Sequence, residues 1–425
     1  MKSSFSLAAF VGCLLIGACS QDTAIADQSA AEPATDRMRM EVLRQAALDN
    51  GFVRSADLRL PVDPAKREAG RLLFESRNMS LDGTISCQDC HLDQFGSTDG
   101  NANAVGAGAT GEGPDRMADS EHRILPRNVL PFWGRGSKGF NTFFWDGKVT
   151  VADGKIVSQF GGSAPSSDPM IVAAHLPSVE LREMIEDSSK VRQAYVTESV
   201  DAADAIQKKL AARFAADKSI GPVLSKAFQR SPGQITFLHV ADALSSFIRD
   251  EFRIRPTRLE RFVYDNGAIS RQELAGGILF YGRGKCSSCH NGPYFTDFQF
   301  HAVAFPQAGF GKNGFGVDEG RYNVTHNPFD RFLFRTPPLF NVTKTAPYSH
   351  SGSVTRLEDA IIAHFDPLRF INPQKMNLRE RADLMERLGP ASREPLPATL
   401  TDDEVRALAA FLAMLDFEKS SVRPQ

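Results

Sequence analysis

The sequence of 425 residues lacks a charge excess of either sign, since 49 Lys and Arg residues oppose 51 Asp and Glu residues. A chain with this balance has no net positive charge to attract a phosphate backbone, which argues against nucleic-acid binding. Tyrosine and tryptophan are rare, at 6 and 2 residues, whereas Phe occurs 31 times and mainly indicates core packing. After residues 5–18, no apolar run is long enough to span a bilayer, so the rest of the chain is expected to be soluble.

Cysteine is also scarce, and four of the six residues fall in two copies of one motif, Cys87-Gln-Asp-Cys90-His91 and Cys286-Ser-Ser-Cys289-His290. This pattern is the attachment sequence of a c-type haem. Its two thiols add to the two vinyl groups of one porphyrin, and the His supplies an axial nitrogen to the iron. A bare Cys-x-x-Cys could instead be a redox disulfide or half of a zinc site, and two copies could form one four-cysteine zinc site. The His after each pair favours two haems, because the chain holds only nine His.

The other two cysteines, Cys13 and Cys19, lie near the N-terminus. Residues 5–18 have the length of a signal-peptide core, and the following Leu15-Ile-Gly-Ala-Cys19-Ser20 resembles a bacterial lipobox. We therefore expect a lipoprotein signal peptide over residues 1–19 and a periplasmic protein that contacts the membrane only through a lipid on Cys19. An ordinary signal peptide with an incidental cysteine is the alternative. Residues 20–37 are small and polar, which predicts a flexible tether.

The length predicts two domains. The segments Gly70-Arg-Leu-Leu-Phe74 and Gly276-Gly-Ile-Leu-Phe280 each precede one haem motif, and this internal repeat indicates two related haem domains. We place the boundary near Pro256, with an N-terminal domain over residues 38–255 and a C-terminal domain over residues 256–425.

Several helices are expected from apolar periodicity and capping residues. One covers residues 38–49, one opens at Pro64, and one covers residues 235–248. A last helix begins after Thr401, whose side chain and that of Glu404 form a predicted capping box.

The chain resembles the bacterial di-haem cytochrome c peroxidase and MauG superfamily. The matching segments span residues 60 to 420 in family order: Asp63-Pro-Ala-Lys through Phe74, Asp82-Gly-Thr-Ile-Ser-Cys87, Arg127-Asn128, Phe144-Trp145-Asp146-Gly147, Arg335-Thr-Pro-Pro-Leu-Phe-Asn-Val342 and Ala346-Pro-Tyr-Ser-His350. The resemblance implies a mainly α-helical fold with few short strands and two cytochrome c-like domains that face each other. It also implies that peroxide meets the N-terminal haem and that the C-terminal haem passes or stores electrons.

The resemblance assigns roles to further residues. Trp145 matches a tryptophan that lies between the haems in the family, although core packing is the simpler reading. Asn128, Thr345 and Pro347 match the protein ligands of a calcium ion between the haems, the last two through backbone carbonyls. Oxygen ligands of this kind suit Ca²⁺.

The second axial ligand of the C-terminal haem is the position that departs most clearly from the family. Fourteen residues after His350, the peroxidases have Met and the MauG-type enzymes have Tyr, but this chain has His364. We predict that His290 and His364 ligate one iron; a surface helix His is the alternative. Imidazole in place of the thioether should lower the haem potential.

The N-terminal site also departs from the family, whose catalytic acid is a Glu in a Glu-Met pair about twenty residues after the Trp. Asp168, before Pro169-Met170, is the nearest acid and our candidate for moving the peroxide proton, with a helix N-cap as the alternative. His122 lies in the loop where some peroxidases keep a displaceable sixth ligand, or is a loop His without this role.

These assignments favour a periplasmic oxidoreductase of the cytochrome-c peroxidase type. It would reduce hydrogen peroxide to water with electrons from a small redox protein, either a cytochrome c or a cupredoxin. A MauG-like enzyme, which would oxidise side chains of a partner protein through a high-valent iron state, is the second hypothesis. A pure electron-transfer cytochrome is the third, and it would require that His122 or His175 permanently cap the first iron. The family often forms homodimers, so a homodimer is possible.

Overall fold

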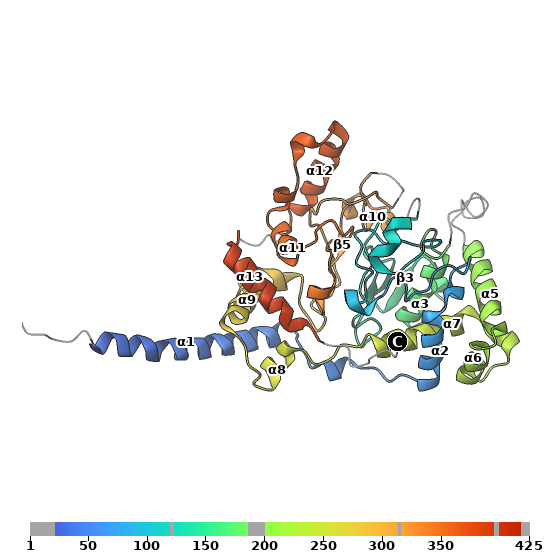
Figure 1. The fold of residues 1–425 in the computed structure, drawn as a ribbon, viewed down its shortest axis with the longest axis horizontal. Helices are drawn as coiled ribbons and strands as arrows, with labels where there is room; N and C mark the ends of the chain where they lie inside the picture. The colour runs from blue at the N-terminus through green and yellow to red at the C-terminus, as the bar shows by residue number, and fades with distance from the viewer. Residues whose placement is uncertain (1–21, 120–122, 186–199, 313–315, 395–398, 418–425) are drawn as a thin grey trace, which may run out of the picture.

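The computed structural model describes residues 22–119, 123–185, 200–312, 316–394 and 399–417. Within these ranges the protein is mainly α-helical with few short strands, as the fold-class prediction requires (Figure 1). The helices are α1 (Asp22–Asp49), α2 (Pro64–Glu75), α3 (Pro169–His175), α5 (Val200–Ala216), α6 (Gly221–Phe228), α7 (Phe237–Glu251), α8 (Arg258–Tyr264), α9 (Arg271–Tyr281), α10 (Tyr322–Thr325), α11 (Leu357–Ala363), α12 (Leu378–Ala391) and α13 (Asp402–Leu412). None of these described helices combines the length and the apolar character that a membrane crossing requires.

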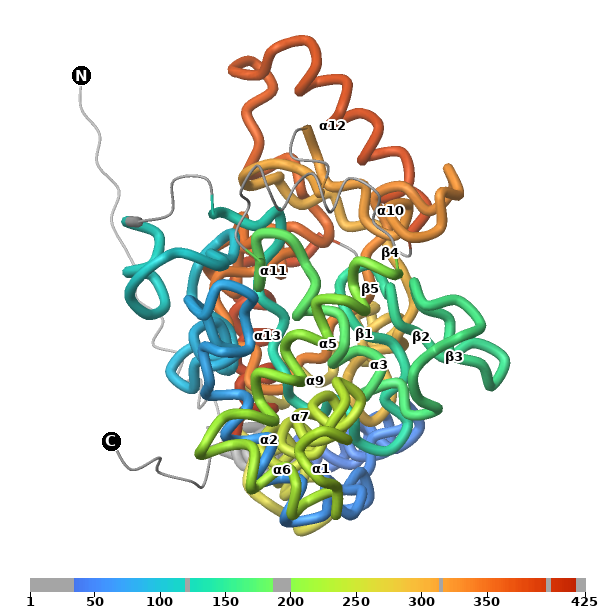
Figure 2. The backbone as a smooth tube through the Cα atoms, turned by 90° about the vertical axis from the view of Figure 1, so that its right-hand side faces the viewer, coloured from blue at the N-terminus to red at the C-terminus, as the bar shows by residue number. Residues whose placement is uncertain are grey.

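The strands form two small antiparallel sheets. The first has the order β1 (Thr142–Phe143), β2 (Val149–Ala152) and β3 (Lys155–Ser158), and the second pairs β4 (Phe300–His301) with β5 (Phe334–Arg335). In β4–β5, Phe300 lies opposite Arg335. The first sheet lies at the side of the molecule and α12 stands out at one end (Figure 1, Figure 2).

The N-terminal domain is built on the crossing of α2 and α7. Helix α2 begins at Pro64, and the Asp63 side chain accepts hydrogen bonds from the first free backbone N–H groups. The two helices cross at Gly70, where a Cβ atom would lie only 1.9 Å from the carbonyl oxygen of Ala243. Only glycine permits this close approach of the two backbones.

The C-terminal domain repeats this crossing with α9 and α13. Here a Cβ atom on Gly276 would lie 1.9 Å from the carbonyl oxygen of Ala407. The predicted capping box of Thr401 and Glu404 starts α13. The repeated Gly-x-x-Leu-Phe segments thus place the same helix crossing beside each Cys-x-x-Cys-His turn, with the Phe of each segment buried in the core.

The first helix differs from the sequence-based expectation. Residues 22–37, predicted as a flexible tether, are helical and continuous with the predicted helix over residues 38–49. A composition rich in alanine, the strongest helix former, is the local cause of this helix, and the role of residues 20–37 as a tether stays a prediction. Helix α1 packs mainly against α9, where Leu43 lies over Gly277, and so against the C-terminal half, although we assigned residues 38–49 to the N-terminal domain. The boundary near Pro256 stays a prediction.

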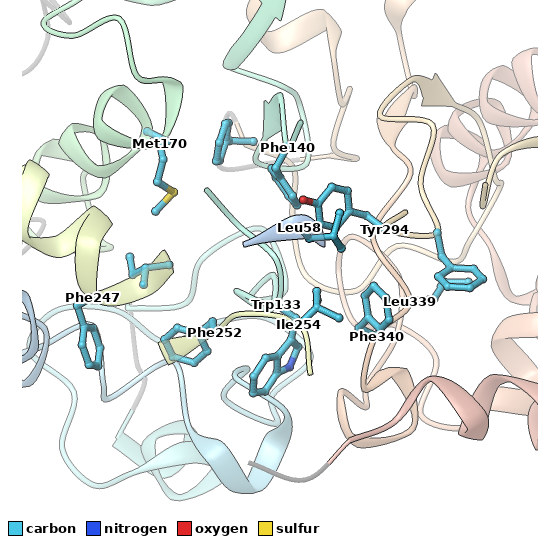
Figure 3. Packing of buried hydrophobic residues seen from close by; sticks show 14 of the residues in the cluster. Leu58, Trp133, Phe140, Met170, Phe247, Phe252, Ile254, Tyr294, Leu339 and Phe340 are labelled. Atoms are coloured by element: carbon cyan, nitrogen blue, oxygen red, sulfur yellow. The ribbon is translucent and has the colours of Figure 1, made fainter. Parts of the chain in front are cut away.

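One hydrophobic core runs through both halves of the chain. Figure 3 shows Trp133 and Ile254 between Phe252 on the N-terminal side and Phe340 on the C-terminal side. The Trp133 ring meets the Phe252 ring edge-on at a centroid distance of 5.5 Å. A continuous core of large rings holds two domains in one relative orientation, because sliding them apart would expose apolar surface at about 25 cal/mol per Å².

Candidate functional site

Two imidazoles face each other in the C-terminal domain. His290 follows the second Cys-x-x-Cys pair, and His364 caps the C-terminal end of α11. Their ring centres are 6.4 Å apart. The Nδ1 atom of His290 lies 3.0 Å from the Phe295 carbonyl oxygen, and that of His364 lies 2.8 Å from the Ala360 carbonyl oxygen. A carbonyl oxygen only accepts, so each Nδ1 donates its hydrogen and each Nε2 keeps a free lone pair.

This arrangement suits a shared metal ion. An iron between two imidazoles needs roughly 2 Å for each metal–nitrogen bond and about 1 Å for each ring radius, or roughly 6 Å in all. Burial lowers the pKa of His290 to about 4 and also lowers the pKa of His364. Both rings are therefore held in the neutral form that binds metals.

The two imidazoles line a cavity of about 270 Å³ whose walls are mostly apolar. The thiols of Cys286 and Cys289 belong to the same wall. The backbone N–H of His290 donates to the Cys286 carbonyl oxygen at 2.8 Å, which closes the motif into one turn and puts both thiols and the imidazole on one cavity. The donor set and the apolar walls fit a covalently attached haem.

The first Cys-x-x-Cys-His turn is closed in the same way, by a hydrogen bond from the His91 N–H to the Cys87 carbonyl oxygen at 3.1 Å. The His91 Nδ1 atom donates to the Ser97 carbonyl oxygen at 2.9 Å, and burial lowers the pKa of His91 to about 3. The rings of Phe74 and Phe132 lie against His91. Among the described residues no second imidazole contacts the His91 ring.

Two histidines were considered as a cap for the first iron. His122 lies outside the described residues, so its proposed role stays a prediction. The His175 ring packs edge-on against Phe160 and Phe237, and its Nδ1 donates to the Ile171 carbonyl oxygen at 2.7 Å. His175 is therefore engaged in the packing of α3 and does not line either cavity.

The cysteines do not gather into one zinc site. Cys87 lines a smaller cavity in the N-terminal domain, and Cys286 and Cys289 line the larger one. None of the four forms a disulfide in the structure. Within the described ranges, the one metal-like group near them is Cys289 with Asp297 and His301. The His301 ring lies between Asp297 and Glu394, at 2.8 Å from each, and these hydrogen bonds raise its pKa to about 12, so it forms an ionic triad with the two carboxylates.

A short wall separates the two cavities. Phe144 lines the N-terminal cavity, and the next residue, Trp145, lines the C-terminal one. The Trp145 Nε1 atom donates to the Asn128 carbonyl oxygen at 3.0 Å. Arg335, from the C-terminal half of the chain, fixes this wall with two hydrogen bonds. Its side-chain Nε donates to the Phe144 carbonyl oxygen at 2.9 Å, and its backbone N–H donates to the Trp145 carbonyl oxygen at 2.8 Å. Trp145 thus lies on the wall of the C-terminal cavity next to Phe144, and its place between two haems stays a prediction.

The predicted calcium residues lie together beside this wall. Asn128, Thr345 and Pro347 all line the C-terminal cavity. The Asn128 side-chain amide lies 2.6 Å from the Pro347 carbonyl oxygen. The calcium ion itself stays a prediction.

Asp168 has structural contacts. Its carboxylate accepts a hydrogen bond from the Met170 N–H at 2.9 Å and so caps the N-terminus of α3. The other carboxylate oxygen pairs with the Arg249 guanidinium at 2.7 Å. These contacts account for the residue as an N-cap, so its catalytic role stays a prediction without further support.

Glu183 is the acid that sequence reasoning missed. Burial and the nearby Glu180 carboxylate raise its pKa to about 7, the range that suits proton transfer at neutral pH. Its charge raises the pKa of the Cys87 thiol, which is a sign of its proximity to the first haem motif, and the next residue, Met184, lines the N-terminal cavity. The signal was present, because Glu183-Met184 is a Glu-Met pair. It stands 38 residues after Trp145, and the β2–β3 hairpin lies in this longer interval.

Two related helical domains, each with a Cys-x-x-Cys-His turn on a cavity, define a di-haem c-type cytochrome. A family model described as di-haem cytochrome c peroxidase matches residues 64–267. The chain is 26% identical to methylamine utilization protein MauG of Methylorubrum extorquens over 80% of this chain and 82% of that protein. It is 27% identical to cytochrome c551 peroxidase of Pseudomonas aeruginosa over 71% of this chain and 72% of that protein.

Among solved structures, the diheme peroxidase BthA of Burkholderia thailandensis has the same fold, with a TM-score of 0.60 at 19% identity over 86% of this chain and 89% of that chain. The family model and these relatives confirm the resemblance to the di-haem cytochrome c peroxidases and MauG that the motifs predict. This family match implies two c-type haems and an oxidoreductase of the peroxidase kind.

Proposed function

We propose that the protein reduces hydrogen peroxide to water with electrons from a small redox protein, a cytochrome c or a cupredoxin. The observation that carries this proposal is the asymmetry of the two sites. In the C-terminal site His290 and His364 face each other, which suits a haem closed on both sides. In the N-terminal site His91 has no second described imidazole opposite it, and Glu183 lies nearby.

The residues that would hold the haems follow from this geometry. Cys87, Cys90 and His91 would hold one haem, and the second motif together with His364 would hold the other. When bound, the haem irons supply the one-electron redox chemistry. The net reaction takes up two electrons and two protons for each peroxide and releases two waters.

The chain would supply the proton relay. A peroxide molecule at the N-terminal cavity must lose a proton from one oxygen and gain one on the departing oxygen. Glu183, with its pKa near 7, is able to accept the first proton and to donate it to the second oxygen. We therefore assign the relay to Glu183 and not to Asp168, whose carboxylate is held by Arg249 and by the start of α3.

Trp145 would serve electron transfer. The Phe144–Trp145 wall contacts both cavities, so electrons that enter at the C-terminal site must pass this segment. The hydrogen bond from Trp145 to Asn128 and the clamp by Arg335 fix the indole in place. Calcium at Asn128, Thr345 and Pro347 is part of the same proposal, as is a periplasmic location with a lipid at Cys19.

A second candidate function is oxidation of side chains in a partner protein. His364 favours it, because an imidazole ligand in place of the Met of the peroxidases should lower the potential of the C-terminal haem. A low-potential second haem is a poorer acceptor for electrons from a cytochrome c and a better store for an oxidising equivalent. The relative named MauG supports this alternative to the same extent as the peroxidases support the first.

The test uses purified holoprotein with both haems. EPR and optical spectra are recorded before and after one equivalent of peroxide, in the as-isolated and half-reduced states. The proposal predicts one high-spin and one low-spin haem, with a peroxide-dependent change in the spectrum of the high-spin haem. The spectrum should return rapidly to its initial form when a reduced small cytochrome or cupredoxin is added. Long persistence despite these donors would favour the protein-oxidising function. Two low-spin haems that do not respond to peroxide would contradict both enzyme functions and indicate that the protein only carries electrons.

A further inference from the structure

Two buried arginines lie on opposite sides of the interdomain wall. Arg335 is 1% exposed and lines the C-terminal cavity, and Arg135 is 7% exposed and lines the N-terminal one. Among the described residues neither guanidinium forms an ion pair with a carboxylate. Arg127 shows the contrast, since this largely buried guanidinium pairs with Asp146 and Asp318 at 2.6 Å each.

The contacts of the two guanidiniums leave donors unused. Arg335 donates from Nε to the Phe144 carbonyl oxygen and from Nη1 to the Thr336 carbonyl oxygen at 3.2 Å, whereas a guanidinium carries five N–H groups. Arg135 donates to the Leu130 carbonyl oxygen at 3.5 Å, the outer limit of a hydrogen bond. Its charge otherwise lies over the Phe132 ring at 4.9 Å.

Two such cations should carry a large desolvation cost, since a buried charge without a counter-ion is strongly unfavourable. Burial lowers the pKa of Arg335 to about 9 and that of Arg135 to about 10, and the charge of Arg135 contributes to the lowering at Arg335. The two cations therefore also repel each other across the wall. Glu183 acts on Arg135 without forming an ion pair with it, since its charge raises the pKa of the guanidinium. Each cavity thus presents one buried guanidinium that could still bind an anion directly.

We propose that Arg335 and Arg135 each bind a propionate carboxylate of the haem in the cavity that the residue lines. A haem c is fixed to the Cys pair through its vinyl groups, so its propionates are the anionic groups that it brings into a cavity. A guanidinium suits them, because its fork of N–H groups can hold both oxygens of one carboxylate. The inference rests on the two haem sites, as the proposed function does, but not on peroxide turnover.

The pairing would set the redox balance of each haem separately. A guanidinium beside a propionate disfavours the more positive ferric state and so raises the midpoint potential of that haem. Because the Arg335 side chain also donates to the Phe144 carbonyl oxygen, the same side chain would join the C-terminal haem to the wall between the sites.

The experiment is a spectroelectrochemical titration of the holoprotein and of Arg335→Gln, Arg335→Lys and Arg135→Gln, with haem content measured for each. Arg331→Gln is the matched control, since Arg331 makes an ion pair with Glu319 away from the residues that line either cavity. Loss of the Arg335 guanidinium should lower the midpoint potential of the C-terminal haem by about 59 mV. For a one-electron couple, this corresponds to a tenfold lower ratio of reduced to oxidised haem at a given potential. Arg335→Lys should shift it less, and Arg135→Gln should act mainly on the N-terminal haem.

Potentials that stay at the wild-type values in both Gln variants, with full haem content, would overturn the inference. If the variants fail to fold or to retain haem, the crystal structure of the wild-type holoprotein decides. Each guanidinium should then lie within hydrogen-bond distance of a propionate oxygen, and propionates bound elsewhere would refute the pairing. The titration uses no peroxide, so it can succeed even if the protein proves to be an electron carrier.

Discussion

His290 and His364 present their free Nε2 atoms from opposite sides of one cavity, with ring centres 6.4 Å apart. They come from segments 74 residues apart in the sequence, a haem-attachment turn and the end of α11. The separation is that of two imidazoles on one iron. This pair sets the ligation and the expected potential of the C-terminal haem, and with them the balance between the two candidate functions.

Replacement of His364 by Ala should convert the C-terminal haem from low-spin to high-spin, because one strong axial ligand is lost. Replacement by Met should keep it low-spin and raise its potential, since a Met ligand raises haem potentials. EPR and a redox titration check both outcomes. His326→Ala is the control, because His326 caps the short helix α10 and lines neither cavity. A low-spin C-terminal haem in His364→Ala would show that His364 is not the ligand.

Glu183→Gln should reduce the rate of the peroxide reaction by about 10²–10⁴-fold while haem content stays full, because the side chain keeps its size but no longer moves a proton. Asp168→Asn should leave that rate nearly unchanged. It should instead lower the free energy of unfolding by up to about 1 kcal/mol through the lost Arg249 ion pair, since Asn caps a helix about as well as Asp. Stopped-flow mixing with peroxide and thermal unfolding separate the two effects. The opposite pattern would return the catalytic role to Asp168.

The raised pKa of Glu183 predicts two pH dependences. The carboxylate is the base, so the rate of the peroxide reaction should rise as the pH passes through about 7. The folded protein holds a proton on Glu183 that the unfolded chain releases near the ordinary value of 4.5. The free energy of unfolding should therefore fall as the pH rises from about 4.5 to 7. Both trends should weaken in Glu183→Gln; a flat rate profile in the wild type would argue against this base.

Trp145→Phe should slow turnover with an electron donor at least severalfold, while the single reaction of peroxide with the N-terminal site keeps its rate. Turnover should slow because Trp145 lies in the wall that electrons must cross. The single reaction with peroxide should keep its rate because proton transfer by Glu183 does not involve Trp145. Steady-state donor oxidation and single-turnover mixing measure the two rates. Trp133→Phe is a suitable control, since Trp133 is buried in the core and lines neither cavity. Equal loss of both rates in Trp145→Phe would point to a structural role.

Removal of calcium by a chelator should lower the melting temperature and the turnover rate, and added Ca²⁺ should restore both. Asn128→Ala should abolish this response, because the side-chain amide is the one proposed ligand that is not a backbone carbonyl. Metal analysis of the purified protein gives the stoichiometry. A chelator-insensitive protein without bound calcium would remove the ion from the proposed function.

Gly70→Ala and Gly276→Ala should each lower the free energy of unfolding by about 3 kcal/mol or more, because the new methyl group would lie 1.9 Å from a backbone oxygen of the crossing helix. Gly389→Ala, in α12, should be neutral or stabilise the protein by up to about 1 kcal/mol, since its Cβ meets no atom within 4 Å. Denaturant unfolding of the three holoproteins checks this. Similar stabilities would mean that the helix crossings are less tight than the structure has them.

The sequence predicted much of the scaffold because its signals are local. The capping box of Thr401 and Glu404 and the start of α2 at Pro64 depend on neighbouring residues only. Residues 22–37 are helical although their polar composition predicted a flexible segment, because they also have a high helix propensity. The packing of α1 on the C-terminal half could not be predicted, since it depends on a partner surface more than 200 residues away.

The acid beside the first site shows a different failure. The predicted spacing after Trp145 led to Asp168, yet the Glu-Met pair stands further along the chain, beyond α3. Only the fold distinguishes the two carboxyls. Asp168 meets Arg249 and a helix N-terminus, and Glu183 is half-buried beside another acid, Glu180.

The sequence by itself determined the two haem-attachment turns, the repeated glycine segments and the family, because covalent attachment and close helix crossings each demand fixed residue types at fixed short spacings. The tertiary structure alone decided which distant groups meet across the cavities. It brought Arg335 to the carbonyls of Phe144 and Trp145, and it left the guanidiniums of Arg335 and Arg135 without an ion pair to a described carboxylate. Burial and charge pairing depend on the folded surroundings of a side chain, and the spacing of residues along the chain does not specify those surroundings.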